Sequence, residues 1–141
     1  MKETTENLLK ELKNKNLSLQ SYIERNPDSF IVLDIKEFWD GLISKTGKSK
    51  ADIINKSDIS YSYFYDIISG KKMPTIDMVV RVALAMHLTL DETNEALRHA
   101  DRRMLSPRIK RDAAMIKAIS CKYTVMQCNN LLSEINEEHL K

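Results

Sequence analysis

Side chains that could contact nucleic acid are concentrated between Lys48 and Lys72. A short helix predicted from Ser60 to Ser69 turns tyrosine, serine and aspartate side chains outward, and all of these can form hydrogen bonds. Its inner positions, Phe64 and Ile67, are apolar and would lock it against a preceding helix. A second helix held in this way can enter the major groove of DNA, which is about 12 Å wide. The spacing therefore predicts a helix-turn-helix.

The histidines and cysteines do not form the patterns that catalysis or metal binding would need. His87, His99 and His139 are scattered, with no cysteine or carboxylate at metal-ligand spacing. Cys121 and Cys128 are seven residues apart, which favours core packing over a metal or redox site. The sequence also has no Gly-rich phosphate loop and no Ser/His/Asp arrangement in its usual context. We expect no enzymatic activity, no metal and no cofactor.

Composition predicts the fold class that positions these side chains. The chain has 141 residues, of which 43% are hydrophobic and 30% charged, an ordinary balance for one domain or one domain with an extension. It contains only three glycines and three prolines. An all-β fold needs a turn about every 8–12 residues, so this count is too low for one. We therefore expect an all-α protein.

Membrane and secretory classes are disfavoured. The longest apolar runs are short pieces such as residues 78–80, far below the roughly 20 residues of a membrane span. The first residues are of mixed charge and lack the apolar core of a signal peptide. Two cysteines are too few for a disulfide framework. These features predict a cytoplasmic location.

Capping patterns divide the chain into three predicted parts. Residues 1–33 form a preface of two short amphipathic helices, residues 34–100 hold five helices, and residues 101–141 form a helical hairpin. The first helix of that hairpin should begin at Ser106-Pro107, with proline at the first helical position. The last helix should bury apolar residues as far as Ile135. The other predicted caps are Ser18, Asp34, Ser49, Ser60, Thr75, Thr89 and Thr124.

A faint internal repeat has a spacing of 35 residues. Two copies are too few for a solenoid, which needs about three. The repeat therefore favours two similar helical hairpins that pack on each other. The shift superposes residues 88–90 on 123–125, Asn94 on Asn129, Leu97 on Leu132 and Ala83 on Ala118.

Two segments carry a resemblance to a known family. The first lies between Gly47 and Pro74 and includes GKSKADII, DIS and YFYDIISGKKMP; the second, VALAMHLTLDE, occupies residues 82–92. Together they resemble the helix-turn-helix of phage repressors of the Cro/Xre type. Residues 105–114 and 129–132 are similar to an extension in a subgroup of bacterial, mainly Firmicute, proteins of this type. The resemblance implies a five-helix, lambda-repressor-like domain in residues 34–100 and regulation of transcription.

The resemblance also assigns contacts to DNA. The family's base-reading positions fall on Lys50, Tyr61, Ser62 and Asp66, with Tyr65 beside them, and its phosphate contacts on Lys48, Lys71 and Lys72. The chain departs from the family pattern at Lys50, where glutamine is common, at Asp58, where the turn often has glycine, and at Ile68, where glutamate is common. Asp66 can accept a hydrogen bond from cytosine, but its charge repels phosphates.

Positive charge is not concentrated in the predicted motif. Residues 34–74 hold seven basic and six acidic residues, whereas residues 98–122 hold eight basic and two acidic ones. The second run has two interpretations: a solvated loop and helix face, or an auxiliary strip that contacts phosphates. The second matters because DNA affinity depends largely on the neutralisation of phosphates. This basic strip comprises Arg102, Arg103, Arg108, Lys110 and Arg111.

Two functions from different classes stay open. The leading hypothesis is a sequence-specific transcriptional regulator that binds double-stranded DNA as a homodimer, with half-sites about one helical turn apart. The alternative is a protein-interaction module, such as an antitoxin-type partner, with the same fold. The low charge of the motif, Asp66 and the outward Tyr61 and Tyr65 motivate this alternative.

Overall fold

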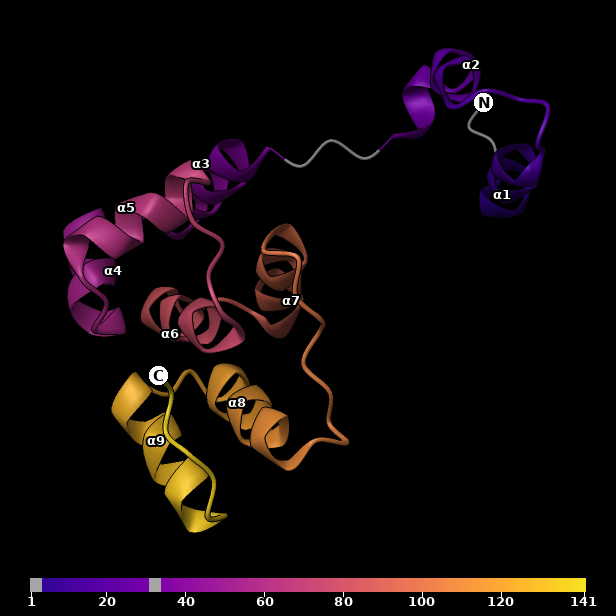
Figure 1. Ribbon diagram of the computed structural model, residues 1–141. Coiled ribbons are helices and arrows are strands. Elements are labelled where there is room, and N and C mark those ends of the chain that lie inside the picture. Colours follow the sequence, from indigo (N-terminus) through magenta and orange to yellow (C-terminus); the bar gives the residue numbers. More distant parts are fainter. Residues whose placement is uncertain (1–3, 31–33) are drawn as a thin grey trace. The chain divides into compact units, whose positions relative to one another are not determined.

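Helices make up all of the regular structure in the part of the chain that is described. The computed structural model describes residues 4–30 and 34–141 (Figure 1). No strand occurs in these two ranges, which confirms the all-α fold class. None of their helices is long and apolar enough to cross a membrane. The helices are α1 (Thr5–Lys13), α2 (Leu19–Arg25), the short 3-10 helix η1 (Pro27–Ser29), α3 (Ile35–Thr46), α4 (Lys50–Ser57), α5 (Tyr61–Ser69), α6 (Ile76–Met86), α7 (Leu90–His99), α8 (Lys110–Ser120) and α9 (Val125–Glu134).

The first of two compact units spans residues 1–33, and its described part contains α1, α2 and η1. The Asn26 amide ties these helices together, because it donates to Glu11 Oε2 at 2.8 Å and to the Tyr22 carbonyl at 3.0 Å. Tyr22 and Asn26 are the only buried residues of the described range 4–30, so this range has almost no apolar core. Its large apolar side chains are exposed instead: Leu9, Leu12, Leu19, Ile23 and Phe30.

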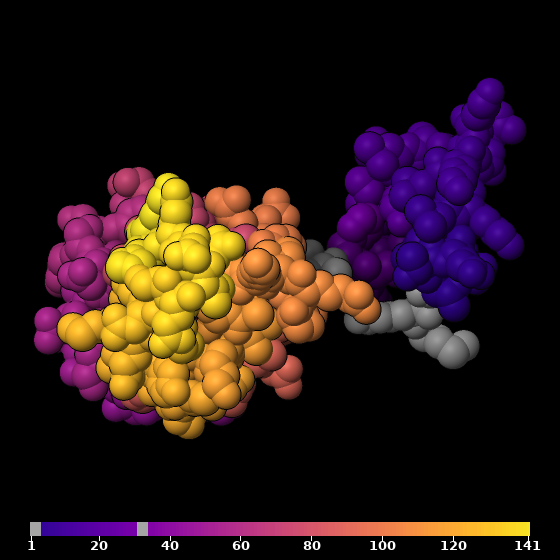
Figure 2. Space-filling view, turned by 90° about the horizontal axis from the view of Figure 1, so that it is seen from below, coloured from indigo at the N-terminus to yellow at the C-terminus, as the bar shows by residue number. Residues whose placement is uncertain are grey.

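The second unit, residues 34–141, is built around one hydrophobic core. Trp39 of α3 and Phe64 of α5 belong to the same buried cluster as Met115 of α8 and Leu132 of α9. Helix α6 lies at its centre and contacts α4, α7, α8 and α9. The space-filling view shows α8, in orange, and α9 with the following residues, in yellow, on one face of this unit (Figure 2). The C-terminal hairpin is therefore packed onto the helices that precede it.

Seven of the described helices begin at the caps that the sequence predicts. In each, the side-chain oxygen of the cap accepts a hydrogen bond from the backbone N–H three residues later. This bond satisfies a donor that the first helical turn leaves without a partner. The caps are Ser18, Asp34, Ser49, Ser60, Thr75, Thr89 and Thr124.

Two expectations for the C-terminal hairpin are wrong. Helix α8 begins at Lys110 rather than at Ser106-Pro107, and its N-cap, Ile109, makes no side-chain capping bond. The Ser106 backbone N–H is instead held by Asp112 Oδ2 at 2.9 Å, and this contact with a buried carboxylate overrides the local Ser-Pro pattern. Ile135 is the C-cap of α9 and 38% exposed, so it does not belong to the core.

The 35-residue repeat is a repeat of backbone structure. We call residues 76–106, with α6 and α7, the first hairpin, and residues 110–141, with α8 and α9, the second hairpin. Each turns through a residue with positive φ: His87 at 54° and Lys122 at 57°. Each second helix then starts with a full capping box, Thr89 with Glu92 in α7 and Thr124 with Gln127 in α9.

The segments that follow α7 and α9 are also equivalent. The Asn94 side-chain oxygen accepts a hydrogen bond from the Leu105 N–H at 3.1 Å, and Asn129 accepts one from Leu140 at 2.8 Å. Both pairs are 11 residues apart, and both leucines are buried. The expectation of two similar hairpins is confirmed.

Each hairpin also holds the end of the other. The Ser106 N–H, at the end of the first hairpin, donates to Asp112 in α8 at 2.9 Å. The Lys141 N–H, at the end of the second, donates to Asp77 in α6 at 3.0 Å. Because the two donors and the two acceptors are each separated by 35 residues, the exchange is reciprocal. The hairpins pack as an approximate two-fold pair, with α6 against α8 and α9, and α7 against α8.

Helix α3 packs mainly against α5, runs antiparallel to α7 and contacts α7 near both ends. The Phe38 ring stacks on His99 at the end of α7, with centroids 3.9 Å apart. Lys45, seven residues later in α3, pairs with Glu92 near the start of α7 at 3.0 Å. The two contacts join α3 to both ends of α7.

Candidate nucleic-acid interface

Helices α4 and α5 occupy the positions where the sequence predicts the two helices of the motif. Ile53 and Phe64 are completely buried and Ile67 almost so, and these side chains anchor both helices in the core. Between the helices Asp58 adopts the left-handed conformation, with φ 57°, which an aspartate tolerates. Helix α5 ends at Gly70, whose φ of 83° suits glycine, and a Cβ there would lie 3.4 Å from a side chain of α3.

The exposed face of α5 brings several predicted contact residues together. Tyr61 is 66% exposed, Ser62 is exposed, and Tyr65 lies half-buried beside them. The Tyr61 and Tyr65 ring centroids are 4.6 Å apart. Lys50 at the start of α4 places its Nζ 5.6 Å from the centroid of the Tyr65 ring, within cation–π range. These four side chains form one surface, which we call the tyrosine face.

Tyr61 of this face keeps its hydroxyl proton at physiological pH. A side-chain hydrogen bond with Tyr65 raises the pKa of Tyr61 above its ordinary value, and this outweighs the opposing charge of Lys50. The face can therefore offer hydroxyl groups and apolar ring surface at physiological pH. Hydroxyls can bond to base edges, and apolar surface can contact the thymine methyl group in the major groove.

Asp66 is neutralised within the chain. Its carboxylate lies 3.5 Å from Lys72 Nζ, and the Lys72 N–H donates to the Asp66 carbonyl at 3.1 Å. The Lys72 ammonium also lies 5.8 Å from the centroid of the Tyr63 ring. The Lys72 charge thus reduces the repulsion between Asp66 and phosphates. The same ion pair leaves Lys72 less available for a phosphate contact of its own.

The predicted phosphate-contacting lysines differ in their surroundings. Lys71 is exposed and Lys48 half-buried, and within residues 34–141 neither forms an ion pair. Burial lowers the pKa of His87, and the charges of Lys48, Lys122 and Lys56 lower it further. Lys48 therefore belongs to a basic cluster with Lys56 and Lys122, which our sequence analysis missed. The repeat offered one indication, because it superposes Lys122 on His87.

Three members of the basic strip are held by the fold. Arg111 pairs with both oxygens of Asp77 at 2.7 and 2.8 Å, and Arg103 pairs with Asp112. Arg102 donates from Nε to a backbone carbonyl at 3.1 Å. Burial opposes ionisation of both aspartates, but the arginine bonds, a backbone N–H and nearby positive charge lower the pKa of each. Two members of the strip stay exposed without an ion pair in the described residues: Arg108 and Lys110.

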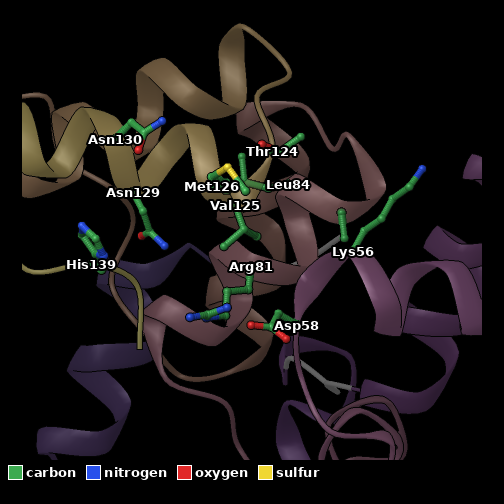
Figure 3. Close-up of a pocket in the computed structure, with 11 residues that line it drawn as sticks. Lys56, Asp58, Arg81, Leu84, Thr124, Val125, Met126, Asn129, Asn130 and His139 are labelled. Carbon is green, nitrogen blue, oxygen red and sulfur yellow. The ribbon is translucent and has the colours of Figure 1, made fainter.

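A pocket of about 590 Å³ lies between the turn after α4 and the start of α9 (Figure 3). Figure 3 shows Arg81 beside Asp58, while Lys56 points away from both. The Arg81 guanidinium donates to the Ser57 carbonyl at 3.2 Å and to the carbonyls of residues 140–141 at 2.6 and 3.1 Å. Its hydrogen bonds connect the end of α4 to the second hairpin and leave it little capacity for a ligand.

The other reactive side chains are dispersed. No cluster of three histidine, cysteine or acidic residues that could hold a metal occurs within residues 4–30 and 34–141. Cys128 is buried in the core, and burial raises the pKa of its thiol to about 11, whereas Cys121 is exposed. Compared with known proteins, the chain matches no family model, no curated protein and no solved structure.

Proposed function

We propose that this protein is a sequence-specific DNA-binding regulator of transcription, with α5 as its recognition helix in the major groove. Helices α3 to α7 would form a lambda-repressor-like domain of the Cro/Xre type, and the protein would act as a homodimer in the cytoplasm. The observation that carries the proposal is the tyrosine face, a surface of tyrosine and serine hydroxyls beside the Lys50 ammonium, on two helices that are anchored in the core.

The surroundings of this face support contact with duplex DNA. Lys50 can approach a guanine edge from the start of α4, and Tyr61 and Ser62 can reach bases from the first turn of α5. The exposed Lys71 follows the end of α5, where it can meet a phosphate. Pairing of Asp66 with Lys72 reduces the repulsion that the Asp66 carboxylate would exert on DNA phosphates in this orientation.

Fluorescence anisotropy with labelled duplexes tests the proposal. The full chain is titrated into a random duplex and into the upstream region of its own gene, at about 50 and 200 mM salt. We expect salt-dependent binding that favours the upstream region, because a regulator that controls its own gene binds there. Absence of binding to either duplex at low salt would count against DNA binding and in favour of the alternative below.

Three substitutions separate base reading from phosphate contact. Lys71→Ala should weaken binding to all duplexes and lower the salt slope by about one. Tyr61→Ala and Ser62→Ala should instead change the preference among sequences. Lys15→Ala, which removes an exposed lysine of the first unit, is the matched control and should change neither. Equal effects of the first three variants would show that the assignment of the face is wrong.

A second candidate function is a protein-interaction module, such as an antitoxin-type partner. The exposed tyrosine pair favours it, since tyrosine is enriched in protein interfaces, and so does the engagement of three arginines of the basic strip within the fold. This function predicts one stoichiometric partner protein whose binding is weakened by Tyr61→Ala, together with no measurable affinity for duplex DNA.

A further inference from the structure

An open groove of about 480 Å³ runs between α8 and α9 on the outer side of the second hairpin. Its apolar floor includes Ala114, which is buried, and its walls include Leu131 and the 38% exposed Ile135. Lys110 and Lys117 stand at its edge, and neither forms an ion pair within the described residues. The apolar positions of this groove have nothing packed on them in the second unit.

The surface of the first hairpin that is equivalent to this groove is less exposed and is contacted by another helix. Ala100, the equivalent of Ile135, is only 4% exposed. His99, the equivalent of the exposed Glu134, lies under the ring of Phe38. Helix α3, an amphipathic helix antiparallel to α7, therefore contacts the first hairpin at the equivalent surface. The second hairpin repeats the surface but has no covering helix.

Helix α1 carries the same apolar spacing as α3. In α3, Phe38 is followed by Trp39 and, after two polar or small residues, by Leu42; a shift of 30 residues superposes these positions on Leu8, Leu9 and Leu12 of α1. Leu9 and Leu12 are 47% and 49% exposed, so most of this stripe has no partner within residues 4–30. A unit of this size buries little apolar surface alone, which favours packing of its exposed leucines on another surface.

Charge also suits a helix of this kind. The described range 4–30 contains four basic and four acidic residues, so no net charge opposes its approach to another copy. Glu6, one turn before the leucine stripe, forms no ion pair in the described residues. Its carboxylate can meet the unpaired ammonium groups of Lys110 and Lys117 at the edge of the groove.

We propose that the α8–α9 groove binds helix α1 of a second copy of this chain. Reciprocal exchange of α1 between two copies gives a closed two-fold dimer, in which each groove is filled once. The inference rests on the proposed function in one respect, because a two-fold operator needs such a dimer. It assigns the dimer contact to residues outside the helix pair α4 and α5 and leaves the tyrosine face accessible.

Sedimentation velocity of the full chain without DNA tests the contact. We expect a dimer whose dissociation constant lies in the micromolar range, since only a few apolar side chains are buried per groove. Leu9→Glu and Ile135→Glu should each weaken dimerisation by roughly 30-fold or more. Both side chains are exposed, and unchanged circular dichroism would show that the fold survives. The control is Met104→Glu, a 65% exposed position outside both surfaces, which should dimerise normally.

Mixing the two variants distinguishes this contact from other modes of self-association. A Leu9→Glu chain keeps its groove, and an Ile135→Glu chain keeps its α1 stripe, so an equimolar mixture can form one intact contact. The mixture should therefore associate although each variant alone is monomeric. A wild-type chain that stays monomeric at about 100 µM, or a mixture that does not associate, would overturn the proposal. Because association is measured without DNA, a dimer that fails to bind duplex would contradict only the proposed function.

Discussion

The two hairpins of the second unit share their backbone devices and differ in what covers them. Both have a left-handed turn residue, a capping box and an asparagine that holds the following segment. Helix α3 contacts the first hairpin at both ends of α7, whereas the second hairpin presents an open groove. Hydrogen bonds of the backbone thus define the hairpin, and the apolar residues on its outer side determine what packs there.

The carboxylates that join the hairpins also differ in how deeply they are buried. Asp112 is 2% exposed, and it binds Arg103 and the Ser106 N–H. Asp77 is less buried and binds Arg111 and the Lys141 N–H. The reciprocal bonds therefore make the second hairpin a structural part of the unit, although its outer face is free. Four experiments can contradict or refine this comparison.

Core substitutions at equivalent positions should have the largest effect. Leu97 and Leu132 are both completely buried, and Leu→Ala at either site should cost about 2–5 kcal/mol of unfolding free energy. We expect the higher cost for Leu97→Ala, because α3 prevents collapse around the cavity, whereas side chains beside the open groove can move into it. Urea unfolding of the two variants measures the difference. A higher cost for Leu132→Ala would contradict the idea that the groove allows relaxation.

Equivalent asparagines should have equal and smaller effects. Asn94→Ala and Asn129→Ala each leave the N–H of a buried leucine without its acceptor, which should cost about 1–3 kcal/mol. Chemical denaturation gives both values, and Asn130→Ala, one position along α9 at an exposed site, serves as the control. A large cost at only one of the two sites would show that the hydrogen-bond pattern is repeated without equal energetic weight.

Local helix signals could be predicted from the sequence because they depend on neighbours in the chain. The caps at Ser49, Ser60 and Thr89 are examples, since their partners lie three residues away. The start of α8 could not be predicted from local patterns. The hydrogen bond from the Ser106 N–H to Asp112 and the ion pair of Asp112 with Arg103 form only in the folded protein. Polar pairing across the fold outweighed a favourable Ser-Pro pattern.

The candidate site shows the same limit. Helical spacing was sufficient to place Phe64 in the core and Tyr61 at the surface. It could not show that Lys72 neutralises Asp66, because this contact depends on how the chain turns after Gly70. The engagement of Arg111 by Asp77 joins residues 34 positions apart and has no local signal. The sequence could therefore predict which residues lie on the candidate surface, but not which of their charges are paired.

Acid should weaken the joint between the hairpins. The folded protein lowers the pKa of Asp77 and of Asp112, so their contribution to stability is fully present above the unfolded value of about 3.9. It is lost as the pH falls through the lower folded values, because protonation breaks the bonds to Arg111 and Arg103. Thermal unfolding between about pH 5 and 2 should show this loss, and Asp112→Asn should reduce it. An unchanged profile in that variant would contradict the assignment.

The smallest effect concerns the two turn residues. His87 and Lys122 both have left-handed backbone conformations that glycine adopts without strain, so His87→Gly and Lys122→Gly should each stabilise the protein by roughly 1 kcal/mol or less.

The two gains should respond differently to pH. Burial and the neighbouring lysines lower the pKa of His87, so protonating it favours the unfolded state as the pH falls below about 6.5. The gain from His87→Gly should thus be larger at about pH 5 than at pH 8, because the variant also removes this charge from beside Lys48 and Lys56. Lys122→Gly keeps the histidine and relieves only part of the repulsion, so its gain should change less. Equal pH dependence in both variants would mean that His87 does not titrate against the basic cluster.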